Sequence, residues 1–492
     1  MAQEKDRRDR DELNMRQNRR AELRKKKLAQ QRRMKRRLIL AAVLLLVCGL
    51  GIFFIARSSG SFGIHLEKEP QQETEAAVET TRPPAPTEET RAPRHNPITR
   101  IHIKAAGDLN VTTAVVDSGL SAGGYDYTQA FIDVAPVLSD ADLTVLNFEG
   151  NVCGEPYGSE TRSAPKELLT GLLNAGVDVV QTANSYSVWN GLIGLNTTLN
   201  NIRASGLVPV GAYTSPEEFD RSKGYIICDV QGIKVAMVAF TKGLGGRGMP
   251  AGNEECVNLL YEDYDESYKK VNTKAITRVL RSAAAEKPDI TIAMLHWGSE
   301  FNDQISRTQT EIVELMQSEG VDVILGSHPH TVQWVDFDKD AGTLVAYSLG
   351  DFFGDATAAG TNYSIILDLE ITKDATSGVT KVTDYTYTPI YTLAETDREE
   401  EAGISRQVVR IRTAMEARRG NYVDRITDGT NGAMEYSLQR IHDRISGKDQ
   451  DPEQIAAAQK AKEEAAKKKA EEEAKAKKEK EKAEKKAEKT NR

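Results

Sequence analysis

The sequence has few cysteines, few aromatic residues and only one long apolar run. Four cysteines in 492 residues exclude a disulfide-dense secreted module. With 37 glycines, the chain falls far below the one-third glycine share of a collagen-like fibre. A single long uncharged apolar run, at residues 38–56, excludes a transporter with several membrane spans. The length of 492 residues suggests two or three structural units, of which some are not globular.

The four cysteines show no recognisable pairing pattern. Cys48 lies in the apolar run, and the other three, Cys153, Cys228 and Cys256, follow it. No CxxC spacing occurs, and three cysteines cannot all pair within one chain. One intramolecular disulfide is compatible with the sequence, and its partners stay open.

The net charge of −8 combines three regions of different sign. Residues 1–37 hold 16 Lys and Arg against 6 Asp and Glu, a net of +10. Residues 451–492 hold 14 against 11, a net of +3. The remaining residues, 38–450, hold 35 basic and 56 acidic residues, a net of −21. A middle region this acidic argues against nucleic acid as a partner.

The apolar run, residues 38–56, holds 19 consecutive uncharged residues, enough to cross about 30 Å of hydrocarbon as a helix. A cleaved signal peptide is the rival interpretation, but the basic region before the run is too long for one. We therefore predict a single uncleaved transmembrane anchor, with Arg36 and Arg37 holding the head, residues 1–37, in the cytoplasm. The body then lies outside the cytoplasm, and the basic head can also contact anionic lipid.

Two further segments cannot form a core. Residues 57–97 are rich in Glu, Thr and Pro, as in TTRPPAPTEETRAP, which predicts an extended stalk. Residues 450–492 are almost wholly Ala, Glu and Lys, which predicts a solvated helix or a disordered spacer without a coiled-coil seam.

The body, residues 98–395, has the pattern of an α/β domain. Amphipathic stretches such as KELLTGLLNAG and QTEIVELMQSEG alternate with apolar runs, which predicts a buried parallel sheet with helices on its faces. The later runs YSIILDLEIT and TKVTDYTYTPIY lack intervening helices and are expected to be antiparallel. Residues 396–449 are predicted to form one or two helices packed on the body. The parallel strands are expected in IHIKAAGD, DLTVLNFE, DVVQTAN, KVAMVAF, ITIAMLHW, VDVILGS and TLVAYSLGD.

Polar residues with metal-ligating side chains follow five of these runs. The carboxyl ends of strands in open α/β sheets are where ligands bind. We therefore expect a site at this edge of the sheet. Its candidate residues are Asp108, Glu149, Asn184, His296, His328 and His330.

Each candidate ligand also has a purely structural interpretation. The Gly-Asp pair ending at Asp108 can be a turn, Glu149 can cap a helix, and His296 can be a hydrogen-bonded core residue. His328 and His330, which flank a proline, are the most specific feature. A mixed His and carboxylate set suits zinc, manganese or iron, and two such ions can polarise a phosphoryl or carboxyl group and activate water.

Eight motifs occur in the order AAGDLN, DLTVLNFEG, TANSYSVWNG, GLVPVGAY, AFTKGLGG, MLHWGSEF, GVDVILGSHPHTVQ and VAYSLGDF. In this order they resemble motifs of the CapA family of capsule or poly-γ-glutamate synthesis proteins. The resemblance covers residues 100–355 and implies a metallophosphoesterase-like β-sandwich flanked by helices, with a dinuclear metal site at its edge. It does not extend to the head, stalk or tail.

The resemblance also assigns roles by motif. It implies metal ligation by Asp108, Glu149, His296, His328 and His330. Catalytic roles go to Tyr186 and His296, and substrate contacts to Asn184 and Lys242. Asn147 is expected to orient Glu149, and Arg307 to lie on a solvated helix face rather than face an anionic substrate.

Three positions depart from the family pattern. The family segment reads A-N-N-H, whereas this chain has Ser185 and Tyr186 at the last two positions. Serine is a weaker neutral ligand than an amide, and tyrosine, with a pKa near ~10, is a slow acid at neutral pH. Asp351 stands where the family tends to have Asn. These changes place one metal site and hydrolytic turnover in question.

Three functional interpretations follow. The first is a membrane-anchored extracytoplasmic protein that acts on an anionic cell-envelope polymer such as poly-γ-glutamate, together with other membrane proteins of a synthesis complex. The second is a non-catalytic scaffold of such a complex. The third is a general metallophosphoesterase unrelated to capsule.

Overall fold

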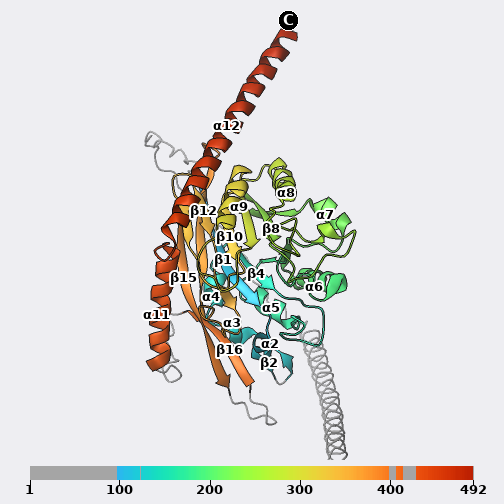
Figure 1. Ribbon diagram of the computed structural model, residues 1–492, viewed down its shortest axis with the longest axis vertical. Coiled ribbons are helices and arrows are strands. Elements are labelled where there is room, and N and C mark those ends of the chain that lie inside the picture. The colour runs from blue at the N-terminus through green and yellow to red at the C-terminus, as the bar shows by residue number, and fades with distance from the viewer. Residues whose placement is uncertain (1–96, 122, 398–405, 414–427, 491–492) are drawn as a thin grey trace, which may run out of the picture. The chain divides into compact units, whose positions relative to one another are not determined.

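The computed structural model describes residues 97–121, 123–397, 406–413 and 428–490 (Figure 1). The predicted head, the membrane anchor and all of the stalk except Pro97 lie outside these residues. Within the described part of the chain, no helix combines the length and the apolar character that a membrane crossing requires.

Among the described residues, the first of two large sheets has eight strands in the order β16-β15-β14-β1-β4-β5-β6, with β13 added beside β1. Strands β1, β4, β5 and β6 run parallel, as the alternating pattern predicts, and β14 to β16 form an antiparallel meander. Its strands are β1 (Ile98–Asn110), β4 (Leu143–Glu149), β5 (Val179–Gln181), β6 (Val208–Val210), β13 (Asp351–Phe353), β14 (Tyr363–Asp374), β15 (Thr380–Asp397) and β16 (Arg406–Thr413).

The second sheet has six strands in the order β11-β12-β10-β9-β8-β7. Its central strands β8, β9, β10 and β12 are parallel, and an antiparallel strand closes each edge. Its strands are β7 (Tyr225–Val230), β8 (Ile233–Thr241), β9 (Ile290–His296), β10 (Val323–Ser327), β11 (Val335–Asp338) and β12 (Thr343–Ala346). A separate two-stranded sheet pairs β2 (Leu120–Ser121) with β3 (Gly124–Tyr125).

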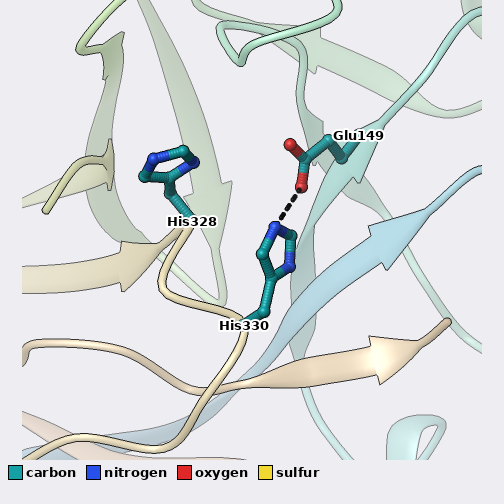
Figure 2. A group of neighbouring side chains, drawn as sticks. All are labelled: Glu149, His328 and His330. Carbon is teal, nitrogen blue, oxygen red and sulfur yellow. Dashed lines mark ion pairs between the residues drawn. The ribbon is translucent and has the colours of Figure 1, made fainter. Parts of the chain in front are cut away.

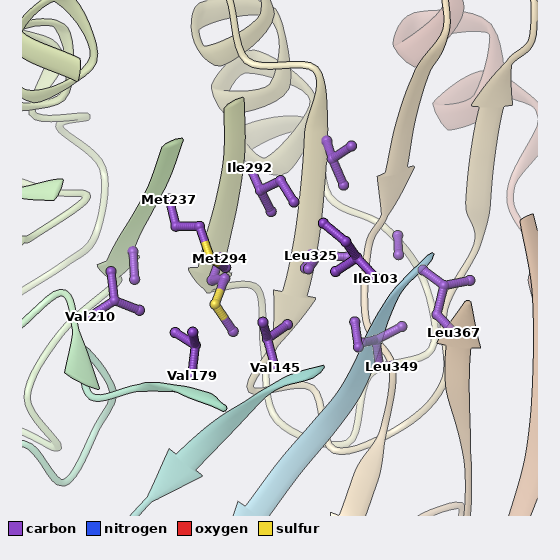
Figure 3. Packing of buried hydrophobic residues seen from close by; sticks show 14 of the residues in the cluster. Ile103, Val145, Val179, Val210, Met237, Ile292, Met294, Leu325, Leu349 and Leu367 are labelled. Carbon is purple, nitrogen blue, oxygen red and sulfur yellow. The ribbon is translucent and has the colours of Figure 1, made fainter. Parts of the chain in front are cut away.

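The two large sheets pack face to face through one apolar layer (Figure 3). Ile103 and Val145 of the first sheet belong to the same buried cluster as Met237, Ile292 and Leu325 of the second. Because the central strands are buried on both faces, they read as continuous apolar runs rather than as alternating patterns. The expected β-sandwich is therefore present in the described residues.

Helices cover both outer faces of this sandwich. Apolar residues of α2 to α6 pack on the first sheet, and those of α8 and α9 pack on the second. The helices are α2 (Thr113–Ser118), α3 (Thr128–Phe131), α4 (Ala135–Leu138), α5 (Glu167–Asn174), α6 (Gly191–Ser205), α7 (Pro216–Ser222), α8 (Thr273–Ala285), α9 (Arg307–Ser318), α11 (Asp428–Ile445) and α12 (Pro452–Thr490), with one 3-10 turn, η1 (Glu254–Cys256).

Helix ends follow local sequence signals. At the start of α9, the Ser306 hydroxyl accepts a hydrogen bond from the Gln309 amide, and the Gln309 side chain accepts one in return from the Ser306 amide. This capping box satisfies two amide groups that the helix cannot pair. Glycines follow α5 and α9 in the left-handed conformation that ends many helices, since Gly176 and Gly320 have φ of 99° and 92°.

Two predictions for the C-terminal part need correction. The segment 396–449 is not purely helical, because residues 406–413 form β16, which pairs with β15; the helix α11 follows. The first part of the tail, the start of α12, packs on the folded domain instead of forming a solvated spacer. Ala458, Ala461 and Ala465 of α12 are buried, and Lys462 forms a 2.9 Å ion pair with Asp336. The sequence could not show this, because an Ala, Glu and Lys helix gains its contact surface only from its neighbour.

The three described cysteines, Cys153, Cys228 and Cys256, are all free thiols. The disulfide that the sequence allowed is therefore absent among them.

Candidate metal centre

The predicted ligands lie where parallel strands of both sheets end. Asp108 lies in β1 and Glu149 ends β4 of the first sheet. His296 ends β9, and His328 directly follows β10, in the second sheet. Because the two sheets face each other, their carboxyl ends bring together side chains that are far apart in sequence.

Two Gly-Asp pairs form the floor of the site. The β1 and β13 strands run parallel with Asp108 opposite Asp351, and the Asp108 amide donates a 2.9 Å hydrogen bond to the Gly350 carbonyl. A Cβ atom at Gly107 would lie 1.8 Å from that same carbonyl oxygen. Glycine is therefore required at 107, because only the absence of a side chain lets the two strands approach.

Asp108 is held by three further contacts. Its carboxylate accepts hydrogen bonds from the Asn147 amide at 2.6 Å and from the His328 backbone amide at 3.0 Å, and His330 Nδ1 lies 3.5 Å away. The structure therefore corrects the role expected for Asn147, whose side-chain amide contacts Asp108 rather than Glu149. Its oxygen accepts a 3.3 Å hydrogen bond from Asn184.

Glu149 faces two of the histidines. Its carboxylate oxygens lie 3.5 Å from His296 Nε2 and 3.9 Å from His330 Nε2, the second contact being the dashed line in Figure 2. Glu149 Oε2 and His328 Nδ1 are buried and make no hydrogen bond with any described residue. Buried polar atoms without partners are rare and costly, so these two atoms indicate a missing ligand.

The loop after β10 holds its histidines in an unusual backbone conformation. His328 and His330, on either side of Pro329, have φ of 90° and 58°, a region that residues other than glycine rarely adopt. The Pro329 carbonyl accepts a 2.9 Å hydrogen bond from the Phe301 amide, and the Phe301 ring stacks on His330 at 5.7 Å. Strain of this kind persists where the surrounding structure fixes it, often at functional sites.

The donor set fits one or two divalent cations. Three overlapping groups each place three ligand atoms within 4.8 Å of one another. A mixed shell of imidazole and carboxylate is typical of zinc, manganese and iron sites. The groups are Glu149, His328 and His330; Asp108, His330 and Asp351; and Asp108, Glu149 and His296.

Burial and mutual repulsion shift the titration of these groups when no cation is bound. Burial raises the pKa of Asp108 to about 6 and that of Glu149 to about 8. Burial also lowers the pKa of His296 and of His328 well below the usual value. For His330, burial acts in the same direction, but Asp351 and the other carboxylates outweigh it and raise the pKa. A bound cation would relieve this concentration of buried acidic groups.

The segment that departs from the family pattern lies beside the histidines. Ser185 Oγ is 3.0 Å from His296 Nε2, so the serine hydroxyl is hydrogen-bonded to the ring nitrogen that also faces Glu149. Burial raises the pKa of the Tyr186 hydroxyl to about 12. Asn184 donates to the Phe148 carbonyl and accepts from the Tyr186 amide. Asn184 thus holds the turn in shape, and its expected contact with substrate stays a prediction.

A cavity of about 300 Å³ opens beside His328 and is lined by Ser185, Lys242 and Glu300, among others. The Lys242 ammonium donates a 2.6 Å hydrogen bond to the Gly298 carbonyl and lies in this wall. This position suits the substrate contact expected of Lys242. Arg307 has an 85% exposed side chain paired with Glu311 on its own helix, as the solvated-face interpretation predicts.

Two residues outside the predicted ligand set also belong to the site. Asp351, which the sequence marked only as a departure from the family pattern, lies with Oδ1 2.7 Å from His330 Nδ1, and its Gly-Asp sequence repeats the signal at Asp108. Arg162 lies over the Tyr186 ring at 4.2 Å. No motif marks Arg162, because its loop reaches the site only through tertiary packing.

Comparison with known proteins decides the family. Residues 102–356 match the family described as bacterial capsule synthesis protein PGA_cap, which is just over half of the chain. The chain belongs to this family. The resemblance to CapA proteins is thereby confirmed, and the PGA_cap match covers both Gly-Asp pairs and all five predicted metal ligands.

Two relatives carry related names. The chain is 26% identical over 301 residues to capsule biosynthesis protein CapA of Bacillus anthracis, covering 59% of this chain and 69% of that protein. It is 26% identical over 251 residues to PGA biosynthesis protein CapA of Bacillus subtilis (strain 168), covering 49% of this chain and 61% of that protein. A solved structure, a phosphatase from Mycoplasma pneumoniae, is 12% identical with a TM-score of 0.37 and covers 67% of this chain and 100% of its own.

Proposed function

We propose that this protein acts outside the cytoplasm, anchored to the bacterial cell membrane, in the synthesis, transfer or anchoring of an anionic capsule polymer such as poly-γ-glutamate. The observation that carries the proposal is the buried cluster of Asp108, Glu149 and three histidines at the strand ends. Membership of the PGA_cap family and the names of two relatives support capsule polymer as the substrate class.

The proposed centre holds one or two divalent cations, of manganese, zinc or iron. Asp108, Glu149, His296, His328 and His330 would hold them. When bound, such ions polarise a phosphoryl or amide carbonyl group and lower the pKa of a water molecule. The fold that we propose for this chemistry is metallophosphoesterase-like, supported by the sandwich with helices on both faces and by ligands from both sheets.

The chain's own residues then perform binding and orientation. Lys242 lies in the cavity wall, where its ammonium can hold an anionic group of the substrate. The Tyr186 hydroxyl, with its pKa raised by burial to about 12, can donate a hydrogen bond but stays protonated at neutral pH. Asp351 fixes the ring of His330 through Nδ1, which leaves Nε2 toward Glu149.

The location is proposed from the sequence. The run at 38–56 would serve as the anchor, and the orientation follows from the basic residues before it. Other membrane proteins of a polymer-synthesis complex are the expected partners of this arrangement.

A second candidate, a non-catalytic scaffold, is favoured by one contact. Ser185 already occupies His296 Nε2 at 3.0 Å, and this serine stands where the family has a stronger amide ligand. A scaffold would keep the fold and the polymer contact without turnover. The third interpretation, a general metallophosphoesterase, has no observation of its own beyond the ligand set.

Hydrolysis assays on the full chain separate these candidates. With manganese, zinc or iron(II) supplied, the proposal expects cleavage of γ-linked oligoglutamate or of a phosphodiester. His328→Ala should abolish this activity, while His442→Ala, an exposed histidine of α11, should leave it intact. Activity on phosphodiesters alone would favour the general enzyme. No activity for wild type, with activity gained in the Ser185→Asn, Tyr186→His double variant, would favour the scaffold.

A further inference from the structure

Three cations around the proposed metal centre are each held over an aromatic ring. Arg162 lies 4.2 Å from the Tyr186 ring centre, Arg247 lies 4.2 Å from that of Trp189, and Lys242 lies 4.6 Å from that of Tyr268. Cation–aromatic pairs occur about once per 70–80 residues in proteins, so three pairs near one cavity are more than this average frequency predicts. They are also notable because residues 38–450 carry a net charge of −21.

Four of these residues form one continuous stack, which we term the arginine–aromatic ladder. The Tyr186 and Trp189 rings meet edge to face at 5.2 Å, and each carries an arginine on a face. The steps from Arg162 through both rings to Arg247 are therefore 4.2, 5.2 and 4.2 Å. The ladder presents two guanidinium groups at separate, fixed positions.

The ladder is connected directly to the centre. Tyr186 follows Ser185, whose hydroxyl contacts His296. On the other side, a Cβ atom at Gly245 would lie 2.9 Å from the Ser185 carbonyl and 3.3 Å from the Trp189 ring. The loop after β8 is thus packed against both residues, and it carries Lys242 at its start and Arg247 five residues further on. The cavity beside His328 lies along this same loop.

The ladder has hydrogen-bond donors to spare. Arg247 is exposed, and its guanidinium makes no hydrogen bond or ion pair with any described residue. Arg162 uses Nη1 to hold Asn110 Oδ1 at 2.8 Å and the Val111 carbonyl at 3.3 Å, which fixes its position. One carboxylate, Glu300, lies in the cavity wall and opposes an anion there.

We propose that the arginine–aromatic ladder is the binding subsite for successive carboxylates of a polyacid chain, which it leads to the metal centre. This inference rests on the proposed function, because the centre is what would act on the chain. Planar guanidinium groups pair with carboxylates in a bidentate manner, and stacking on a ring holds them at little further entropic cost. Two fixed arginines therefore select a chain with repeated anionic groups over a single anion.

The ladder also gives Tyr186 a role as a positioning residue. Its ring lies against the Arg162 guanidinium, and a tyrosine ring attracts a cation strongly. Tyr186→Phe should therefore preserve carboxylate binding, whereas Tyr186→Leu should lose it. A proton-donor role would be affected by both substitutions alike.

Binding of a fluorescent γ-linked hexaglutamate to the full chain tests the proposal, without reference to turnover. The Arg162→Gln and Arg247→Gln variants should each bind about tenfold more weakly, the loss expected for one charge-assisted contact. Arg100→Gln is the matched control, because it removes the same charge eight residues before Asp108 on β1, about 26 Å away. The basic head is common to all variants, so it cancels in the comparison.

The outcomes separate the ladder from the proposed function. His328→Ala should abolish turnover, which tests the proposed function apart from the ladder. If wild type cleaves the hexaglutamate but the ladder variants bind it as tightly as Arg100→Gln does, the ladder is refuted and the function stands. If wild type does not bind the probe, the polyacid subsite is refuted. If the two arginine variants weaken the binding of a polyphosphate probe as much as that of hexaglutamate, the proposed selectivity for carboxylates is overturned.

Discussion

Replacing Gly107 by alanine should separate the two strands that carry Asp108 and Asp351. The added Cβ would lie 1.8 Å from the Gly350 carbonyl oxygen and 2.9 Å from its carbon. Ordinary contact begins near 3.4 Å, so the strands must part by about 1.6 Å. Neither atom belongs to a flexible side chain, and the backbone itself has to move.

The cost combines two effects. Overpacking of this kind costs about 1–3 kcal/mol, and the 2.9 Å hydrogen bond between the Asp108 amide and the Gly350 carbonyl, worth about 1 kcal/mol, is lost. We expect the free energy of unfolding in urea to fall by about 3 kcal/mol, with weaker binding of manganese because both aspartates shift.

A glycine in open space provides the control. Gly123→Ala introduces a Cβ with no neighbour within 4 Å and should leave both measurements unchanged. If Gly107→Ala unfolds at the same urea concentration as Gly123→Ala, the close approach of the two strands is not a property of the folded protein.

Three further predictions address titration, helix propensity and the tail. Burial raises the pKa of Glu149 from 4.5 to about 8, so the cation-free folded chain keeps a proton that the unfolded chain has released. Its stability should therefore fall by about 2 kcal/mol from about pH 6.5 to pH 8 in urea titrations with chelator, and by less in Glu149→Gln. Gly432→Ala, in α11 with no neighbour near its Cβ, should raise the thermal midpoint, because alanine favours helix by about 1 kcal/mol. A chain ending at Lys448 should have a free energy of unfolding in urea about 3 kcal/mol lower than that of a chain ending at Lys475. The shorter chain lacks the two Gln450 hydrogen bonds and the buried face of α12. Equal stability of the two chains would show that α12 does not pack on the body.

The sequence predicts the site well where local patterns determine position. Asp108, Glu149, His296 and the pair His328 and His330 each follow a buried apolar run. Parallel strands place such positions at one edge, so their convergence could be inferred without knowledge of the pairing. The helices between the strands were equally readable, because their apolar spacing is local.

Long-range pairing set the limit of prediction. Asp351 belongs to the site because β13 pairs with β1, more than 240 residues earlier in the chain. No periodicity in either segment encodes that contact. The division into two sheets has the same cause, since successive predicted runs such as DVVQTAN of β5 and KVAMVAF of β8 look alike but lie in different sheets. Arg162 reaches Tyr186 from an irregular loop, for which sequence offers no spacing rule.

The most direct test of the account is cation stoichiometry. Full-length protein, stripped with chelator and titrated calorimetrically with manganese or zinc, should bind one or two equivalents. The Glu149→Gln and His328→Ala variants should each lose at least one equivalent while His442→Ala keeps them all. If the wild type binds no more cation than the His328→Ala variant, the buried cluster is not a metal centre, and the proposed chemistry is contradicted.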